Sequence, residues 1–565
     1  MPVMPHAIHP GPRWPLHDTA ATRRIEQAAA NTLPAHTLMQ RAGLATARLA
    51  LALAPHARRV WIAAGPGNNG GDGLEAALHL HAWGLNPVVT WLGTPDTAPD
   101  DARASWQRAV QAGVAFADQP PADLGPQDLA IDALLGIGAT RAPAGRMADW
   151  LKHMHAGPAP VLAVDVPTGL DADSGWLQAP VTTDSIAASA DPASARSQND
   201  LKRSTPEQSE ARVLLPLPLG EGRGEGQQRI HPQRAHQVPA ARHTLSLLTL
   251  KPGLFTAHGR DACGTLWFDD LGVSATLHAA EPPSAWLNAA PHAAPRPHAS
   301  HKGSFGDVAI VGGEGLAARG MGMTGAALLA ASAALHGGAG RVLVSLLDEG
   351  DITHIPTQPE LMLRRFDRLE LDALTVVCGC GGGDAVASRL PAVLHAAPRL
   401  VLDADALNVI AADPALQTAL RQRATAGQTT VLTPHPLEAA RLLGATSAQV
   451  QQGRLRAATT LAQRFACTVV LKGSGSVIAT PGQAPVINPT GNALLATAGT
   501  GDVLAGLIGA HLAAGRAAPN AASAAVYWHG WAADGWPAAS RLTAGVLAVR
   551  AGAALAPPST PTPSP

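Results

Sequence analysis

The chain has 565 residues, enough for several domains of ~100 to 200 residues, and its 41 basic and 42 acidic side chains give a formal charge of −1, which offers no sign of a nucleic-acid partner. The four cysteines include one close pair, Cys378 and Cys380, whose spacing fits neither a zinc ribbon nor a disulfide framework and favours a reducing cytoplasm. Prolines interrupt the N-terminus and no apolar run reaches ~18 residues, so we expect neither export nor a membrane.

The first part of the chain alternates helical and strand-like segments. Residues 19–53 have helical periodicity. Apolar runs follow in "VWIAA" (60–64), "PVVTWLG" (87–93), "LAIDALLG" (129–136) and "VLAVDVP" (161–167), with helical stretches between them. Continuous apolar strands separated by helices predict a parallel sheet covered on both faces, which is a Rossmann-like, three-layer α/β domain over residues 1–273.

The composition then changes twice before a second alternation begins. Residues 182–240 are rich in Ser, Pro, Gly, Gln and Arg and are predicted to be a disordered insertion in the first domain, and residues 274–300 are predicted to be a linker. Strand-like runs resume in "DVAIVGG", "LTVVCG", "RLVLDAD", "TTVLTPH" and "CTVVLKG". They predict a second α/β domain over 301–555, followed by a tail over 556–565.

A glycine-rich loop, "GPGNNGGDG" (65–73), joins the first strand to a helix. This arrangement binds phosphate in many proteins, but Asp72 occupies the place of the Walker A lysine, which disfavours a nucleoside triphosphate. Asn68 and Asn69 offer amide groups at the helix N-terminus, where Asp72 can act as a cap. A tight capping turn without any ligand is the alternative interpretation.

Polar side chains also follow two further strands. Asp132 and Asp165 end apolar runs, and in an open parallel sheet they can converge with Asn69 and Thr168 at the carboxyl ends of the strands. A single aspartate at a strand end is more often a helix cap. Three strand ends rich in oxygen ligands and without His or Cys indicate a hard cation or a polar substrate.

Four motifs in this order resemble the YjeF N-terminal family, the NAD(P)H-hydrate epimerases: "LMQRAG", "GPGNNGGDG", "IDALLGIG" and "VDVPTGLDADSG". The resemblance spans about 19–181 and implies interconversion of the R and S epimers of hydrated NADH and NADPH. It implies that Asn69, Asp132 and Thr168 hold K⁺, with threonine where serine is usual. The residues it implies for hydrate contact are Asn68, Asn69, Gly70, Gly71, Asp72, Gly136, Ile137, Gly138, Ala139, Thr140, Arg141, Ala142 and Asp165.

Asp165 is the candidate catalytic base of this first site. Arg141 stands where some members of the family have lysine, but a guanidinium stays protonated at neutral pH and can only bind. In relatives the sheet continues almost at once into a sequence like that of residues 242–273. The resemblance therefore implies that the predicted insertion divides one domain into two segments of the chain.

The stretch "TAGTGDVLAGL" (497–507) again places a glycine turn before a helix, predicted to be amphipathic, and an aspartate where a lysine is usual. Amides of residues 499–501 can bind an anion, and Asp502 can take a proton from a hydroxyl beside it, which suits phosphoryl transfer to an alcohol. "LKGSGS" (471–476) suits nucleotide phosphates, while "LDADALN" and "LTPHPLEAARLL" add polar residues at two more strand ends. His435, in the latter, is either a buried structural histidine or part of the site.

Seven ordered motifs between 301 and about 507 resemble the ribokinase superfamily, and within it the ADP- or ATP-dependent NAD(P)H-hydrate dehydratases: "HKGSFGDVAIVGG", "GAALLAASAALHGGAGRV", "PELM", "LDADALN", "LTPHPLEAARLLG", "LKGSGS" and "ATAGTGDVLAGL". The resemblance implies a ribokinase-like fold. It implies hydrate contacts by Ala326, Gly383, His435 and Asp502, and adenine-nucleotide contacts by Lys472, Gly473, Ser474, Gly475, Ser476 and Gly501. Two positions depart from the family: "GCGGG" (379–383) replaces G-P-G-L-G, which changes loop rigidity, and Ser476 replaces threonine.

The resemblances together predict a bifunctional repair enzyme that epimerises NAD(P)H hydrates and dehydrates the S form, with Asp502 as base and Mg²⁺ accompanying ADP or ATP. The rival hypothesis is a ribokinase-like kinase of a vitamin-precursor alcohol with a non-catalytic nucleotide-binding first domain, which leaves Asn69, Asp132 and Asp165 unexplained. Small molecules are the expected partners, without nucleic acid or membrane, and a homo-oligomer is expected.

Overall fold

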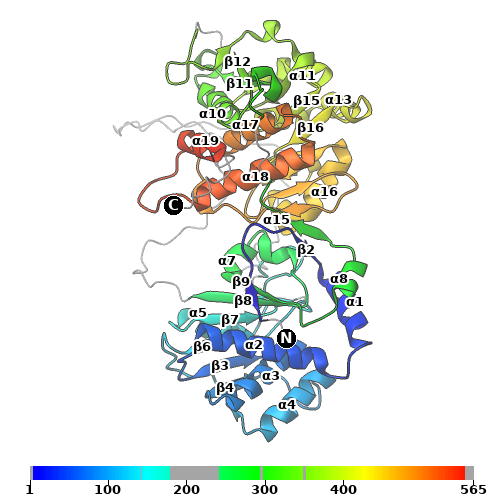
Figure 1. Cartoon of the computed structure of the whole chain (residues 1–565), viewed down its shortest axis with the longest axis vertical. Coiled ribbons are helices and arrows are strands. Elements are labelled where there is room, and N and C mark those ends of the chain that lie inside the picture. The colour runs from blue at the N-terminus through cyan, green and yellow to red at the C-terminus, as the bar shows by residue number, and fades with distance from the viewer. Residues whose placement is uncertain (1–3, 140, 179–240, 293–296, 348–351, 554–565) are drawn as a thin grey trace, which may run out of the picture.

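The computed structural model describes residues 4–139, 141–178, 241–292, 297–347 and 352–553, and it shows two α/β domains stacked along the long axis of the molecule (Figure 1). The expected insertion over 182–240, the expected tail over 556–565 and Thr140 lie outside the described residues. Within those ranges, no helix has both the length and the apolar character needed to cross a membrane.

The first domain contains an eight-stranded sheet that is parallel except at one edge, where β1 runs antiparallel to β9. The four apolar runs predicted as strands all form strands here. In sheet order the strands are β1 (His6–Ala7), β9 (Thr265–Asp269), β8 (Arg242–Leu247), β7 (Val161–Val164), β6 (Leu129–Ala133), β3 (Val60–Ala64), β4 (Pro87–Trp91) and β5 (Ala115–Phe116).

Helices cover both faces of this sheet, because its central strands are apolar on both sides. Val60 and Ile62 of β3 pack on one face with α1–α4, and Trp61 and Ala63 pack on the other with α5. The three-layer prediction is therefore confirmed. The helices are α1 (Thr19–Ala30), α2 (Thr37–Leu53), α3 (Asn68–Ala82), α4 (Asp100–Gln111), α5 (Arg146–Ala156), η1 (Pro252–Phe255), α7 (Gly259–Cys263) and α8 (Ala275–Ala280).

The second domain is built on an eleven-stranded sheet, parallel from β13 to β17 and mixed beyond it. In sheet order the strands are β13 (Met362–Leu363), β12 (Arg341–Leu347), β11 (Asp307–Glu314), β14 (Thr375–Cys378), β15 (Arg399–Leu402), β16 (Thr429–Leu432), β17 (Thr468–Leu471), β18 (Val477–Ala479), β19 (Val486–Ile487), β10 (Ala285–Leu287) and β2 (Trp14–Leu16).

Helices again cover both faces, so this domain is also three-layered. One core joins the sheet to α10 (Thr324–His336), α17 (Thr500–Ala513), α18 (Ala518–Asp534) and α19 (Ala544–Ala553). The other joins it to α11 (Leu390–Ala396), α12 (Asp405–Ala412), α13 (Pro414–Thr425), α14 (Pro436–Leu443), α15 (Ser447–Gln452) and α16 (Arg454–Phe465). Short helices are η2 (Lys302–Phe305), α9 (Leu316–Arg319), η3 (Phe366–Arg368), η4 (Leu371–Ala373), η5 (Asp384–Ser388) and η6 (Ala493–Leu495).

Two sequence expectations are corrected by this architecture. Residues 274–300 do not form a plain linker, because they contain α8 and β10, and β10 pairs with β19 on one side and with β2 on the other. Strand β2 therefore belongs to the second sheet although it precedes the first domain's helices. Strands of two or three residues are too short to show a period in the sequence.

The helix that carries Asp502 also differs from expectation. The sequence predicts an amphipathic helix, but every residue of α17 from Val503 to Ala513 is buried. The helix packs between the sheet and α10, α18 and α19, so it has no face toward solvent along that stretch.

Candidate functional site

The first candidate site lies at the carboxyl ends of β3, β6 and β7, where neighbouring strands connect in opposite directions. A cavity of about 900 Å³ opens there. The predicted residues that line it are Asn68, Asn69, Asp72, Gly136, Ile137, Gly138, Ala139 and Asp165. The predicted contacts Gly70, Gly71, Arg141 and Ala142 are not among its lining residues.

Gly70 and Gly71 are instead buried inside the first turns of α3. A Cβ on Gly70 would lie 2.0 Å from the carbonyl oxygen of Gly65, so the glycine allows the turn to close on itself. The cap assigned to Asp72 is also wrong, because the N-cap of α3 is Gly67 and Asp72 lies within the helix. Asp72 faces the cavity rather than the helix end.

Asp132, in β6, and Thr168, which follows β7, form a direct pair, and neither is among the residues that line the cavity. The Thr168 hydroxyl donates to Oδ1 of Asp132 at 2.7 Å, and the Thr168 amide donates to Oδ2 at 3.0 Å. The amide of Leu134 donates to Oδ1 at 3.2 Å. Burial raises the pKa of Asp132, and these hydrogen bonds oppose the rise. The structure thus unites two of the three residues predicted to hold K⁺.

Asn69, the third of them, meets Asp165 across Gly136. A Cβ on Gly136 would lie 3.2 Å from both Asn69 Oδ1 and Asp165 Oδ2, so a larger residue there would press against both side chains. The Nδ2 atom of Asn69 is buried and has no hydrogen-bond partner among the described residues. This buried amide group, next to a cavity, is available to donate a hydrogen bond to a ligand.

Lys251 is a residue of this site that sequence reasoning missed. Its side chain is completely buried, and its ammonium group contacts the carboxylate of Asp165. It also donates to the carbonyl of Leu247 at 2.7 Å and approaches Ser246 Oγ at 3.3 Å. Asp165 itself has a φ of 68°, in the left-handed region that non-glycine residues seldom adopt. A lysine in "TLKPG", followed by a proline in a chain poor in lysine, is the signal that could have found it.

Further carboxylates gather around this cavity. Burial, together with the carboxylates of Asp165 and Glu26, raises the pKa of Asp72 well above its usual value. Burial and the neighbouring Asp165 also raise the pKa of Glu26. This shift favours the protonated form of Asp72, which can donate a hydrogen bond to a substrate.

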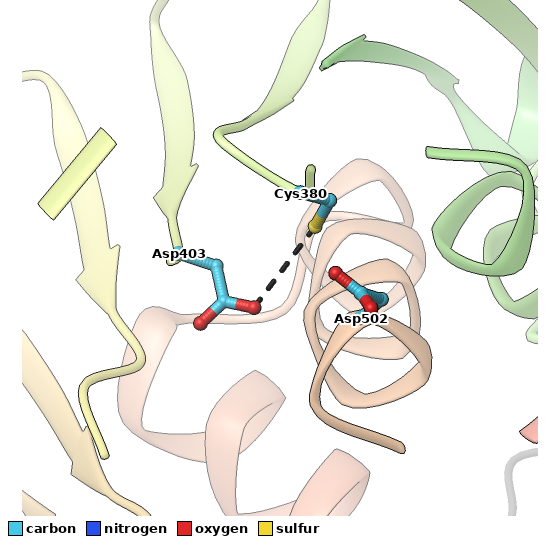
Figure 2. A group of neighbouring side chains, drawn as sticks. All are labelled: Cys380, Asp403 and Asp502. Carbon is cyan, nitrogen blue, oxygen red and sulfur yellow. Dashed lines mark hydrogen bonds between the residues drawn. The ribbon is translucent and has the colours of Figure 1, made fainter. Parts of the chain in front are cut away.

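The second candidate site gathers Asp502, Asp403 and Cys380. Figure 2 shows their side chains pointing toward one another from the start of α17, the end of β15 and the turn after β14. One oxygen or sulfur atom of each lies within 4.8 Å of the others, and the Cys380 thiol lies 4.0 Å from Asp403 Oδ2. Burial and the Asp403 carboxylate raise the pKa of Asp502 to about 7. A carboxyl with that pKa is suited to general acid–base chemistry near neutral pH.

Lys472 is held by carboxylates in this structure. Its Nζ lies 2.7 Å from Asp403 Oδ1 and 4.0 Å from Glu438 Oε2. Burial alone would lower the pKa of Lys472, but these carboxylates outweigh it and keep the pKa above its usual value. Asp403 and Glu438 were not among the predicted site residues, although they lie in the "LDADALN" and "LTPHPLEAARLL" motifs.

The predicted nucleotide residues lie close to this ion pair. A Cβ on Gly501 would lie 3.3 Å from the ammonium of Lys472, which places the start of α17 against the 472–476 loop. Within that loop Gly473 and Ser474 are exposed, and the Ser476 hydroxyl donates to the carbonyl of Gly473 at 3.2 Å.

His435 has a structural role in this arrangement. It is the N-cap of α14, and its Nδ1 accepts from the amides of Leu437 and Glu438 at 3.1 and 3.3 Å. Its Nε2 lies 3.2 Å from Glu438 Oε1. Burial and the nearby Lys472 lower the pKa of His435 to about 4, so the imidazole is neutral at pH 7.

Of the residues predicted to contact the hydrate, Gly383 ends the 379–383 turn and Ala326 lies against that turn. A Cβ on Gly381 would lie 2.8 Å from the Cβ of Ala326. The amide of Gly383 donates to Asp405 Oδ2 at 2.8 Å, and a Cβ on Gly383 would lie 2.2 Å from Glu314 Oε2. The turn is thus fixed by carboxylates although it lacks the proline usual in the family.

Comparison with known proteins matches both halves of the chain. A family model described as "YjeF-related protein N-terminus" matches residues 35–192, and one described as "NAD(P)H-hydrate dehydratase" matches residues 310–556. The bifunctional NAD(P)H-hydrate repair enzyme Nnr of Escherichia coli (strain K12) is 32% identical over 533 residues, which cover 91% of this chain and 88% of that protein.

Two further proteins are similar to part of this chain. The ADP-dependent (S)-NAD(P)H-hydrate dehydratase of Neisseria meningitidis serogroup B is 43% identical over 256 residues, covering 44% of this chain and 83% of that protein. The crystal structure of the ADP/ATP-dependent NAD(P)H-hydrate dehydratase of Bacillus subtilis with ATP/Mg²⁺ is 29% identical, with a TM-score of 0.38, and covers 46% of this chain and 92% of that one.

The rival hypothesis of a vitamin-precursor kinase with a non-catalytic first domain does not account for relatives that match both halves in one chain. The match to the Escherichia coli protein extends over 533 residues, which is longer than either domain alone. The chain belongs to the family of bifunctional NAD(P)H-hydrate repair enzymes.

Proposed function

We propose that the first domain epimerises NAD(P)H hydrate with Asp165 as general base. One observation supports this proposal: the carboxylate of Asp165 contacts the buried ammonium of Lys251 and faces a cavity of about 900 Å³. Asp165 takes the proton of the hydrate hydroxyl as the carbon that carries this hydroxyl becomes a carbonyl, while the bond from this carbon to the ring nitrogen breaks and the nitrogen keeps the electron pair and takes up a proton. The reverse steps on the other face of the carbonyl close the ring again and invert the carbon. Lys251 acts through Asp165: its buried ammonium contacts the carboxylate and holds it in place where it faces the cavity.

The residues present fit a K⁺ ion at this site. Asn69, Asp132 and Thr168 offer amide, carboxylate and hydroxyl oxygens, which are the ligands that hard cations prefer. The carboxylate of Asp132 is 2% exposed, and its pKa is raised by burial, so a cation beside it would offset the cost of burying its charge. When bound, K⁺ would supply positive charge near the hydrate without taking part in proton transfer.

We propose that the second domain dehydrates the S hydrate with Asp502 as base. Asp502 takes the proton of the substrate hydroxyl, the hydroxyl oxygen attacks the terminal phosphoryl group of the nucleotide, and the nucleotide leaves with one phosphate fewer. The carbon–oxygen bond of the new phosphate ester then breaks, and loss of a proton from the adjacent carbon restores the double bond of NAD(P)H. We propose that the phosphates of the nucleotide bind at the start of α17 and to the loop of residues 472–476.

Mg²⁺ accompanies the nucleotide in this proposal and screens its phosphate charge. Lys472 already pairs with Asp403, and the thiol of Cys380 is a poor ligand for a hard cation. Mg²⁺ usually keeps several waters and binds through substrate phosphates, so we assign it to the nucleotide rather than to a cage of protein ligands.

One assay tests both halves of the proposal. The purified full chain is incubated with a mixture of R and S hydrates, Mg²⁺, K⁺ and either ADP or ATP, and the return of NADH absorbance is followed. Complete recovery in one rapid phase indicates both activities. Rapid recovery limited to the S fraction refutes the epimerase assignment, and no nucleotide-dependent recovery refutes the dehydratase assignment.

A further inference from the structure

The loop of residues 472–476 in the second domain is in direct contact with the first domain. Thr256, which follows η1, is completely buried, and its hydroxyl lies 3.2 Å from the carbonyl oxygen of Ser474 and 3.1 Å from that of Gly475. The amide of Ala257 donates to the same Ser474 carbonyl at 3.1 Å. Two consecutive residues of the first domain therefore bind the backbone of the proposed nucleotide loop.

Arg454, the first residue of α16, holds the loop from its other side. Its Nη2 donates to the carbonyls of Leu471 and Lys472 at 3.2 and 3.0 Å, and the side chain is only 1% exposed. Its Nε donates to the hydroxyl oxygen of Thr256 at 3.0 Å. The Thr256 hydroxyl thus accepts a hydrogen bond from Arg454 and donates one to the loop, so it connects Arg454 to the backbone of residues 474–475.

The glycines of the loop are shaped to these contacts. Gly475 has a φ of 62°, and a Cβ there would lie 2.0 Å from the carbonyl oxygen of Phe255. Gly473 has a φ of 132°, and a Cβ there would lie 2.8 Å from Arg454 Nη1. Part of the glycine pattern that indicates a phosphate loop is therefore required for packing against the first domain and Arg454.

The same segment of the first domain is firmly anchored at its other end. Lys251 contacts Asp165, and the amide of Gly253 donates to the carbonyl of Ala172 at 2.7 Å. A Cβ on Gly175 would lie 2.2 Å from the carbonyl oxygen of Thr256. Residues 251–256 are therefore held against the 171–175 loop, so that Thr256 presents its hydroxyl to the second domain in one position.

We propose that Thr256 of the first domain is a positioning residue for the nucleotide site of the second domain. It holds the carbonyls of Ser474 and Gly475 so that the amides of the same loop face the phosphates. The dehydratase therefore depends on the epimerase domain for the shape of its nucleotide loop. This inference rests on the assignment of residues 472–476 to the nucleotide made above.

The variant that tests it is Thr256→Val, which keeps the shape of the side chain and removes the hydroxyl. We expect the KM for ADP or ATP to rise about five- to tenfold, the typical effect of one lost hydrogen bond, with kcat and the KM for the hydrate within about twofold of wild type. Thr256→Ser should restore the nucleotide KM. The epimerase rate should stay unchanged.

Thr244→Val is the matched control. Thr244 is also completely buried in the first domain, and its hydroxyl donates to the carbonyl of Cys263 at 2.9 Å, away from the loop. It should lower the melting temperature as Thr256→Val does, without changing the nucleotide KM. An equal nucleotide KM in wild type and Thr256→Val, or an equal rise in both valine variants, would overturn the proposal.

Amide hydrogen exchange on the wild-type full chain gives an answer even if Thr256→Val does not fold. Addition of ADP, or of ATP in the absence of hydrate, should slow exchange both in residues 472–476 and in residues 256–259. Protection of 472–476 alone would refute the positioning role of Thr256 and leave the loop assignment intact. Protection of neither segment would refute the loop assignment itself.

Discussion

Lys251 lies against Asp165 although residues 182–240 separate the two in the chain. The contact forms because β7, which precedes Asp165, and β8, which precedes Lys251, are adjacent parallel strands of the first sheet. The buried ammonium has the Asp165 carboxylate as its charged partner, and that carboxylate faces the cavity. The candidate base and the group that holds it therefore come from opposite sides of the predicted insertion.

Asp165→Asn should stop epimerisation and leave the second activity unchanged, because an amide cannot accept the proton. The R hydrate would then be consumed only at its spontaneous rate, while the S hydrate would still return NADH with nucleotide. Chromatographic separation of the two epimers over time measures this. A normal rate of R consumption in the variant would place the base elsewhere.

Lys251→Met should destabilise the first domain by about 3–5 kcal/mol, because it leaves a largely buried carboxylate without its cation. Adding Asp165→Asn to it should recover part of that loss, since the double variant has no unpaired charge. A double-mutant cycle by urea unfolding measures the coupling. Additive effects of the two changes would show that the contact contributes nothing specific.

Asp502→Asn should lower the nucleotide-dependent return of NADH by ~100-fold or more, because the base that takes the hydroxyl proton is lost. Nucleotide binding, measured by calorimetry, should be retained, since the carboxylate is not the proposed phosphate ligand. Turnover close to that of wild type would exclude Asp502 as the base.

The pH dependence of the second activity should follow the pKa of Asp502, which burial and Asp403 raise to about 7. Only the ionised carboxylate can take a proton, so kcat/KM for the hydrate should fall about tenfold per pH unit below that pKa and level off above it. The Cys380 thiol, protonated because burial and the Asp502 and Asp403 carboxylates raise its own pKa, stabilises the ionised form of Asp502.

Cys380→Ala should therefore move the acid limb of that profile to higher pH, because it removes the neighbouring thiol that lowers the pKa of Asp502. Cys378→Ala is the control: Cys378 is equally buried but packs into the core on the other face of the sheet. An acid limb that moves equally in both variants, or in neither, would contradict the role of the Cys380 thiol.

Joining Val181 to Ala241 should leave both activities intact. Residues 165–181 would remain between β7 and β8, which exceeds the dozen or so residues that a parallel crossover needs. The 171–178 stretch also keeps its contacts, including the amide of Leu177 with His258 Nδ1 at 3.3 Å. Shortening the loop should change stability by only about 1 kcal/mol. Loss of epimerase activity in the shortened chain would show that residues 182–240 contribute to the first site.

The sequence by itself determined the α/β architecture of the chain and indicated both candidate sites. Runs such as Val60–Ala64 and residues 308–311 are apolar throughout, which is typical of a strand buried on both faces, so they predicted three-layer parallel sheets. Parallel strands place their carboxyl ends at one edge, so the position of Asp165 at the end of an apolar run is enough to assign it to a crevice.

The tertiary structure alone decided which residues support those sites. Lys251, Asp403 and Thr256 contact the sites from strands or turns whose partners lie far away in sequence, and no local period reports such contacts. The strands β2 and β10, which join the N-terminal segment to the second sheet, were missed because three residues are too few to show a period. Local periodicity records which face of an element is buried, whereas the identity of the neighbour on that face is set by how distant elements pack.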